Sequence, residues 1–392
     1  MQETSLFQLI RNAIMEDGSL PADFALPEVP ELEAESVGTP KNSSGAEEVK
    51  SADSRNPEPG AADQVMSTSA SIAAAAAADQ TKATVDAASQ PTNSASTASP
   101  RKVRFVAGAE DGIRIYHFGV TAAPDVAREV ARIIRKDCKR SGTKPSAHLM
   151  ELVRTHTALA LIDDLIDDLC RDMRGVILSN FADYACRLAF DSAEKELVKL
   201  GIALMGMLDT EGEEEITNDL LTLAACDEFT LYVVIALQNR KDTDELVWQI
   251  ARTAHGWGKI HAVERLEPSS PEIREWILRA GLENRVMNSY LALTVAEKGR
   301  LIEALRAETI DDEELFASIE DIVEALLDEG PVAGITVYED REEALTQFLR
   351  HAAMREKSED LSRVVRAIEG KIDAMEFPTA ASMKEHVREI LG

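Results

Sequence analysis

Four similar stretches of sequence decide the fold: LVKLGIALMGML at residues 197–208, DEFTLYVVIAL at 227–237, GWGKIHAVERL at 256–266 and NRVMNSYLAL at 284–293. The leucines that close these stretches are separated by 29, 29 and 27 residues. Within the first three stretches, one apolar position is shared by Ile202, Leu231 and Ile260. Self-similarity at a fixed period of this length is the sequence signature of a repeat architecture.

The segments between these stretches carry a second helical pattern, as in EEEITNDLLTLAA at 213–225 and TDELVWQIARTA at 243–254. Each period therefore predicts two short antiparallel helices. One such pair cannot bury its apolar face alone, so neighbouring pairs must stack into a continuous core. Aromatic residues make up only 5% of the chain, which favours an interior of aliphatic side chains. We expect an all-α body over residues 124–392.

This array of helix pairs resembles the HEAT and armadillo-like superfamily of α-solenoids, most clearly over residues 190–300. The repeat unit is shorter than a standard HEAT repeat, and the proline that is usual in its first helix is mostly missing. The resemblance implies a right-handed α-solenoid over 124–392. It also implies a protein that binds other macromolecules along an extended concave face.

The first 18 residues form a separate amphipathic pattern. Its apolar positions are Leu6, Phe7, Ile10 and Ile14, which share one face of a helix. Two interpretations stay open for this predicted docking helix. It binds a partner protein at the end of a long tether, or it folds back onto the helical body as a cap.

Residues 19–100 are rich in Pro, Ala, Ser, Thr, Asp and Glu, and they include six consecutive alanines at 73–78. A chain of this composition has too little apolar surface to offset the entropy lost on ordering. We therefore predict a disordered linker between the N-terminal helix and the body.

The stretch 101–123 predicts a small β-hairpin. Residues alternate in character over 103–107 and again over 113–118, with Gly108 and Gly112 placed where the chain would bend. In this interpretation the hairpin caps the first helical repeat.

Charge and cysteine content narrow the classes of partner. The formal net charge is −28, and a surface this negative repels phosphate backbones and anionic lipid headgroups, so we expect neither nucleic acid nor a membrane as partner. The four cysteines are widely spaced, and their pattern fits neither a disulfide framework nor a zinc site. With no basic, apolar leader at the N-terminus, the expected compartment is the cytoplasm.

The stretch 254–276 carries the most distinctive side chains of the repeat region. One interpretation is a recognition patch, with Trp257 as an aromatic anchor, Arg265 as a charged anchor and His261 between them. The other is that the glycines of GWG form the turn between two helices while Trp257 fills the groove between repeats.

Three further residues extend this candidate partner-binding set. Tyr232, Arg285 and Tyr290 occupy corresponding places in their repeats. If the second helix of each pair lines the concave face, these side chains form one shared ridge. Ordinary packing between repeats would place them in the same way.

The string DDLIDDLCRDMRG at 163–175 resembles the first aspartate-rich motif of class I prenyl diphosphate synthases. The resemblance implies that Asp163, Asp164 and Asp167 hold Mg²⁺ against a diphosphate. The string departs from that family because its two arginines are not adjacent and no second aspartate-rich motif follows. The simpler interpretation is an amphipathic helix whose aspartates form the solvated face.

Taken together, the sequence predicts a non-enzymatic scaffold or adaptor, without a cofactor, that binds another protein along the concave face of its repeats. The alternative is a Mg²⁺-dependent enzyme that acts on a diphosphate substrate through Asp163, Asp164 and Asp167.

Overall fold

The computed structural model describes residues 4–27, 106–330 and 332–392, and within these ranges the secondary structure is helical throughout, without a strand. Of the described residues, 4–26 and 106–392, apart from 331, belong to one compact unit. The all-α expectation is thus confirmed for the described part of the chain.

The helices of the N-terminal half are α1 (Leu6–Ala13), α3 (Ala109–Ile113), the π-helix η1 (Arg114–Phe118), α4 (Pro124–Asp137), α5 (Ala147–His156), α6 (Ala158–Arg171), α7 (Leu178–Asp191), α8 (Lys195–Met205), α9 (Glu214–Ala224) and α10 (Asp227–Leu237). Those of the C-terminal half are α11 (Thr243–Thr253), α12 (Gly256–Arg265), α13 (Pro271–Ala280), α14 (Ser289–Lys298), α15 (Leu301–Leu305), α16 (Glu313–Leu327), α17 (Arg341–Ala352), α18 (Glu359–Met375) and α19 (Ala380–Leu391).

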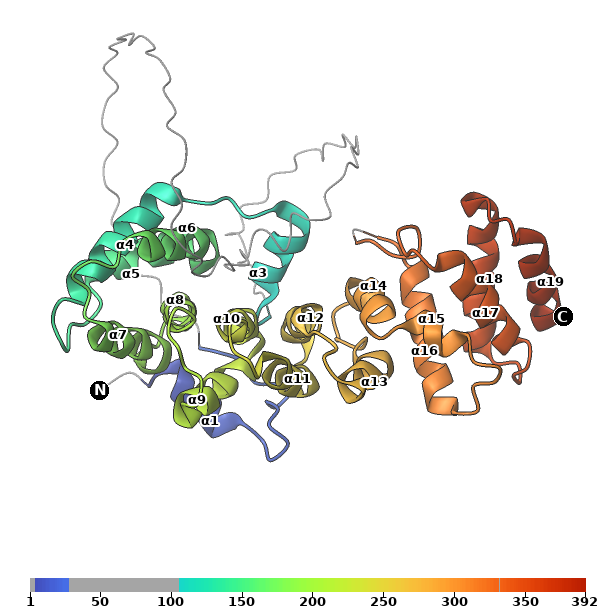
Figure 1. Cartoon of the computed structure of the whole chain (residues 1–392), viewed down its shortest axis with the longest axis horizontal. Coiled ribbons are helices and arrows are strands. Elements are labelled where there is room, and N and C mark those ends of the chain that lie inside the picture. The colour runs from blue at the N-terminus through green and yellow to red at the C-terminus, as the bar shows by residue number, and fades with distance from the viewer. Residues whose placement is uncertain (1–3, 28–105, 331) are drawn as a thin grey trace, which may run out of the picture. The chain divides into compact units, whose positions relative to one another are not determined.

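Consecutive helices pack as pairs, as the repeat predicts. Helix α7 packs against α8, α9 against α10, α11 against α12, and α13 against α14 (Figure 1). The second helices of these pairs also touch one another in order, α8 to α10, α10 to α12 and α12 to α14. The row continues from α14 to α16 and from α16 to α18. We call α8, α10, α12 and α14 the second helices, and α7, α9, α11 and α13 the first helices.

Helices α8 and α10 are buried because they are apolar on nearly every side. Every residue of α8 from Leu197 to Met205 is buried, and in α10 the run from Glu228 to Val234 is buried as well. A helix that is hydrophobic all round belongs in an interior rather than at a surface. Helix α8 is enclosed by α7, α10, α5 and α6.

Local sequence signals fix where many helices begin. The side chains of Ser146, Ser270, Asp312 and Ser358 each accept a hydrogen bond from the backbone N–H three residues later. Such caps satisfy donors that the first helical turn leaves unpaired. Prolines at 124 and 271 stand in the first turns of α4 and α13, where proline has no hydrogen bond to lose.

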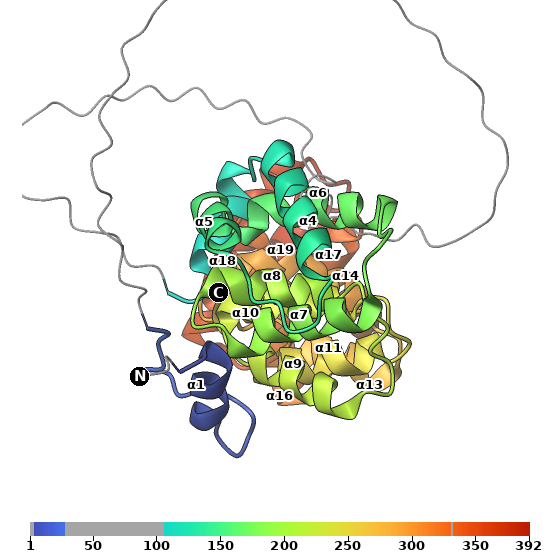
Figure 2. The same cartoon turned by 90° about the vertical axis from the view of Figure 1, so that its left-hand side faces the viewer.

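Helix α1 packs on the body of its own chain, against α7 and α9 (Figure 2). Leu6, Phe7 and Ile10 are buried, and Ile14 is partly buried against the core. The Leu6 N–H donates to the carbonyl of Ser192 at 2.9 Å. Of the two interpretations left open by the sequence, the structure therefore has the helix folded back onto the body.

Two expectations for the N-terminal region need correction. The predicted linker begins too early, because the partly buried Leu20, Phe24 and Leu26 pack against the core. Apolar side chains at this spacing bury enough surface to order 19–27 despite the prolines. The rest of the predicted linker, residues 28–100, lies outside the described residues.

The β-hairpin predicted over 101–123 is wrong where the structure describes it. Residues 109–118 are helical, as α3 followed by η1, while 101–105 lie outside the described residues. Alternating apolar residues suggested strands, but the segment is stabilised by contacts with distant helices rather than by a pairing strand, and such tertiary contacts override local propensity. In the described ranges, none of the helices combines the length and apolarity needed to cross a bilayer.

The close packing of α7 on α8 depends on a glycine. A Cβ atom at Gly201 would collide with the backbone of Ala189 and lie 2.7 Å from Cβ of Leu188. Helical Gly370, in contrast, has open space around it.

We expect Gly201→Ala to lower the free energy of unfolding by about 1–3 kcal/mol, because overpacking forces the two helices apart. Gly370→Ala is the matched control, and it should raise that free energy by about 0.5–1 kcal/mol, since alanine is the better helix former. Urea denaturation followed by circular dichroism measures both. Equal effects of the two substitutions would contradict the tight α7–α8 contact.

Candidate functional site

Segment 106–118, which contains α3 and η1, lies against the second helices. Its contacts run from α8 and α10 at Asp111 to α12 and α14 at Tyr116. Figure 1 shows α3, in teal, beside the row formed by α8, α10 and α12. We call the surface that these contacts cover the second-helix face. A segment distant in sequence thus occupies the helices that the repeat analysis singled out.

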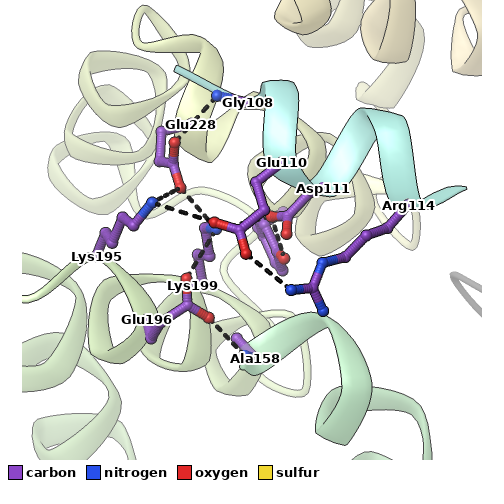
Figure 3. Close-up of polar contacts among 10 residues, drawn as sticks. Gly108, Glu110, Asp111, Arg114, Ala158, Lys195, Glu196, Lys199 and Glu228 are labelled. Carbon is purple, nitrogen blue, oxygen red and sulfur yellow. Dashed lines mark hydrogen bonds and ion pairs between the residues drawn. The ribbon is translucent and has the colours of Figure 1, made fainter. Parts of the chain in front are cut away.

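The centre of the first half of this face is a buried lysine. Lys199 on α8 has a side chain only 1% exposed, and its Nζ is surrounded by three carboxylates. Nζ lies 2.7 Å from Asp111 Oδ2, 2.7 Å from Glu228 Oε1 and 3.0 Å from Glu196 Oε1. Figure 3 shows these side chains converging from α3, α8 and α10. The hydroxyl of Tyr232 donates to the same oxygen of Asp111 at 2.8 Å.

Two of the three carboxylates of this cluster also accept a hydrogen bond from a backbone N–H elsewhere in the chain. Glu228 accepts a hydrogen bond from the backbone N–H of Gly108 at 3.0 Å, which fixes the start of α3. Glu196 accepts from the N–H of Ala158 at 2.6 Å and so caps the N-terminus of α6. The cluster therefore joins three helices and segment 106–118 at one point.

Lys199 and the acidic groups around it stabilise one another in their ionised forms. Burial alone would lower the pKa of Lys199, but the surrounding acidic groups hold it well above its usual value. Burial would raise the pKa of Glu228, but Lys199 and then Lys195 lower it to about 2. Both groups are consequently ionised at neutral pH. A buried charge is tolerated only when it is paired in this way.

Two glycines let segment 106–118 approach closely. A Cβ at Gly108 would lie 2.6 Å from the carbonyl oxygen of Asp227, and φ at Gly108 is +72°. A Cβ at Gly112 would overlap the ring of Trp257. These are the glycines that the sequence placed at the bend of a hairpin. Their actual role is to bring a helix into contact with α10 and α12.

The second half of the face is an aromatic cluster. Tyr116 of η1 lies with its ring centroid 5.7 Å from that of Trp257, 6.1 Å from His261 and 5.1 Å from Tyr290. The neighbouring His117 places Nε2 2.5 Å from the hydroxyl of Tyr290. Tilted and edge-on aromatic pairs at these separations add to the stabilisation from buried area.

Burial shifts the pKa of several titratable groups at this end. Burial lowers the pKa of His261 well below its usual value, and the Arg265 guanidinium lowers it further. Neither ring nitrogen of His261 has a hydrogen-bond partner within the described ranges. Burial also raises the pKa of Tyr116 and of the adjacent Glu264. At this end the segment and the second-helix face therefore meet mainly through aromatic rings.

The structure brings together four of the six residues proposed to bind a partner. Tyr232, Trp257 and His261 are 1%, 4% and 1% exposed, and each is covered, together with half-buried Tyr290, by segment 106–118. Arg265 pairs with Glu264 and donates to the carbonyl of His261.

Arg285 stands apart from this group. It is exposed, with φ at +63°, in the loop before α14. That these six residues bind a separate protein stays a prediction, and the partner that most of them contact is their own chain.

Several residues of the face were missed by the sequence analysis: Asp111, Tyr116, Glu196, Lys199 and Glu228. One signal was present, since Lys199 interrupts the apolar run LVKLGIALM. A lysine in a helix buried on all sides needs acidic partners. The sequence does not say that one of these partners comes from residue 111.

The aspartates of the diphosphate hypothesis are not gathered into a metal site. All three lie on α6, where Asp167 is exposed and pairs with Arg171 at 3.3 Å. Among the residues that the structure describes, there is no group of three or more His, Cys, Asp or Glu side chains that could hold a metal ion. Asp163 and Asp164 are half-buried on this helix, and the diphosphate hypothesis stays a prediction.

The GWG sequence at the start of α12 surrounds a buried carboxylate. Asp227 accepts hydrogen bonds from the backbone N–H groups of His255 and Gly258. A Cβ at Gly258 would lie 2.5 Å from Oδ1 of Asp227, and one at Gly256 would collide with Oδ2. The glycines thus make room for the side chain that ties α10 to α12. Burial raises the pKa of Asp227 to about 7.

Removal of the buried Lys199 charge should strongly lower the free energy of unfolding. We expect Lys199→Met to lower the free energy of unfolding by about 3–5 kcal/mol, because the buried carboxylates of Asp111 and Glu228 and the partly buried Glu196 lose their counter-charge. The control is Lys241→Met, which breaks the exposed pair between Lys241 and Glu211 and should have no measurable effect. Chemical denaturation compares the two variants. If the Lys199→Met variant were as stable as the control, the claim that Lys199 stabilises the fold by pairing with these carboxylates would be wrong.

Asp227 should give the stability a pH dependence of a definite sign. Its pKa is about 7 in the folded chain and has an ordinary value of 3.8. Between these values the folded state holds a proton that the unfolded state has lost, so stability falls as pH rises through this window. Asp227→Asn removes the titration. Urea denaturation at about pH 4.5 and about pH 7.5 should show the wild type losing stability relative to the variant. If the free energies of unfolding of the wild type and of Asp227→Asn changed equally with pH, the burial of Asp227 would be contradicted.

The chain was also compared with protein-family models, with curated proteins and with solved structures, and none of the three comparisons gives a match. Function is therefore inferred from the chain's own contacts. The second-helix face, with its ionic and aromatic halves and the segment that lies on it, is the candidate functional site.

Proposed function

We propose that this protein is a non-enzymatic scaffold whose second-helix face binds a short helical segment of a partner protein. One observation carries the proposal: the face already holds a short helical segment, residues 106–118 of its own chain. Asp111 and Tyr116 of this segment contact side chains on α8, α10, α12 and α14 of the face. A surface that fits one such segment is suited to another of similar chemistry.

We further propose that the helix pairs continue as a right-handed α-solenoid of the HEAT kind, with the second helices on the concave side. Two short helices for each period of about 29 residues support this, as does the contact of each second helix with the next. Arrays of this type offer an extended surface for binding along successive repeats.

The chemistry of the face defines the partner segment. Lys199 requires an acidic residue, as Asp111 now provides. The aromatic cluster requires an aromatic residue one to two turns later, as Tyr116 now provides. Where the segment crosses Trp257, it needs glycine or another very small residue, as at Gly112. Because the face is buried beneath its own segment, a partner must displace residues 106–118 or bind to a chain in which they have left.

The proposal predicts binding in trans. The test uses the full chain with residues 106–118 replaced by a glycine–serine sequence of equal length, and a fluorescein-labelled peptide of residues 106–120. We expect the peptide to bind the replaced chain and not the wild type, since the wild type has the face occupied. Fluorescence anisotropy measures the affinity.

Two controls accompany this experiment. A peptide with Asp111→Asn and Tyr116→Ala should bind at least roughly tenfold more weakly, because it lacks the charge and the aromatic ring. A milder full-chain variant, Asp111→Asn with Tyr116→Ala, keeps the segment in place but weakens it and should show intermediate binding. Circular dichroism confirms that each chain is folded. If folded chains of both kinds fail to bind the unaltered peptide, the face is structural and the proposal is wrong.

A further inference from the structure

A group of exposed cations lies at the end of α4, on a chain whose net charge is −28. Its members form no ion pair with any side chain that the structure describes; they are Lys136, Lys139, Arg140 and Lys144. Within 136–144 the one carboxylate is that of Asp137, which accepts a hydrogen bond from the hydroxyl of Tyr184 at 3.1 Å. This short stretch therefore has a net positive charge that its own neighbours leave unpaired.

The turn between α6 and α7 lies directly beside these cations (Figure 1). Gly175 in this turn has φ at +76°, and a Cβ atom there would lie 3.7 Å from Cε of Lys139. The side chain of Asn180, on the first turn of α7, donates to the carbonyl of Cys138 at 3.1 Å. The end of α4 and the start of α7 thus form one continuous surface.

The start of α7 exposes two aliphatic side chains on this surface. Ile177 is 51% exposed and Leu178 is 66% exposed, two and three residues beyond Gly175. Among the large apolar side chains that are exposed in the described ranges, only these two are consecutive in sequence. Exposed apolar surface that is rimmed by polar groups is typical of an interaction site. We call Lys139, Arg140, Ile177 and Leu178 the basic–aliphatic patch.

We propose that the basic–aliphatic patch binds an acidic segment of a partner protein, in which a leucine or another large apolar residue stands between glutamates or aspartates. The apolar residue packs on Ile177 and Leu178, and the flanking carboxylates pair with Lys139 and Arg140. Charge complementarity identifies this occupant, because unpaired cations attract a segment of opposite sign and reject one of the same sign.

An anionic lipid surface also attracts lysine and arginine, but it fits the chain less well. A bilayer extends far beyond the patch, so the acidic remainder of the chain would face headgroups of its own sign. A peptide is narrow enough to contact the patch alone. The observations therefore favour a protein segment over a membrane.

This inference rests on the proposed function only in that the occupant belongs to a partner protein. It does not require that segment 106–118 leaves the second-helix face. The two ideas therefore fail in different experiments, because the test below uses the full wild-type chain and a peptide that does not resemble residues 106–118.

The test titrates the full chain into a fluorescein-labelled peptide amide of sequence EELEELEE and follows anisotropy at physiological salt. The patch variant is Lys139→Gln with Arg140→Gln. Its control is Lys357→Gln with Arg366→Gln, which removes the same two kinds of charge from exposed positions just before and on α18. We expect the patch variant to weaken binding about fivefold and the control to change it less than about twofold.

The aliphatic pair is tested with the same peptide. Ile177→Ser with Leu178→Gln should weaken binding about fivefold, because the leucines of the peptide lose their apolar contact. Val337→Ser with Met354→Gln changes two similarly exposed side chains elsewhere and should leave binding unchanged. The peptide EEGEEGEE should bind the wild type more weakly than EELEELEE does. Circular dichroism confirms that each chain is folded.

Equal losses in the patch variants and in their controls would overturn the proposal, as would an absence of peptide binding to the wild type. Vesicles of phosphatidylserine and phosphatidylcholine in equal parts test the lipid surface. If the wild-type chain sedimented with these vesicles, lost this binding in Lys139→Gln with Arg140→Gln and did not bind the peptide, the occupant would be a membrane and the assignment to a protein segment would be wrong.

Discussion

The structure depends on one buried cation. Lys199 lies in the middle of a helix that is enclosed on every side, and a charge in such a place is unfavourable unless acidic groups surround it. Its three partners come from α3, α8 and α10, and through Glu196 the cluster also caps α6. Hydrophobic contacts would hold the helix pairs together without this lysine. They would not specify that Asp111, 88 residues earlier, lies at this point. The charge of Lys199 thus makes an otherwise general apolar surface specific for segment 106–118.

Close backbone contacts at glycines add to the specificity that the Lys199 charge provides. Where α3 crosses α10 and α12, the backbone is so close that Gly108 and Gly112 have no space for a side chain. At the start of α12, the missing side chains of Gly256 and Gly258 likewise leave room for the Asp227 carboxylate. Both contacts join elements that are distant in sequence. Small residues at a few positions therefore determine which surfaces meet, while the larger apolar residues supply most of the stabilisation.

The sequence predicts the features that arise from local periodicity, and it misses those that arise from distant contacts. The helix pairs follow from the recurring leucines, as the packing of α7 on α8 and of α9 on α10 shows. The nature of segment 106–118 did not follow, because its alternating pattern fits a hairpin until Lys199 and Trp257 are known to lie beside it. For the same reason Tyr232 and Tyr290 looked like part of a ridge open to a partner. Their spacing placed them on one face correctly, but no periodicity reports that the face is already covered.

Two segments of the chain are docked on the body by different forces. Helix α1 lies on the first helices through Leu6, Phe7 and Ile10, which are apolar, whereas segment 106–118 lies on the second helices through an ionic cluster and an aromatic cluster. Apolar burial is non-directional and accepts many sequences of suitable shape. Paired charges and close backbone contacts accept few, because a mismatch leaves a buried group without a partner. The second-helix face is consequently the more selective of the two surfaces, and selectivity of this kind is what a recognition site requires.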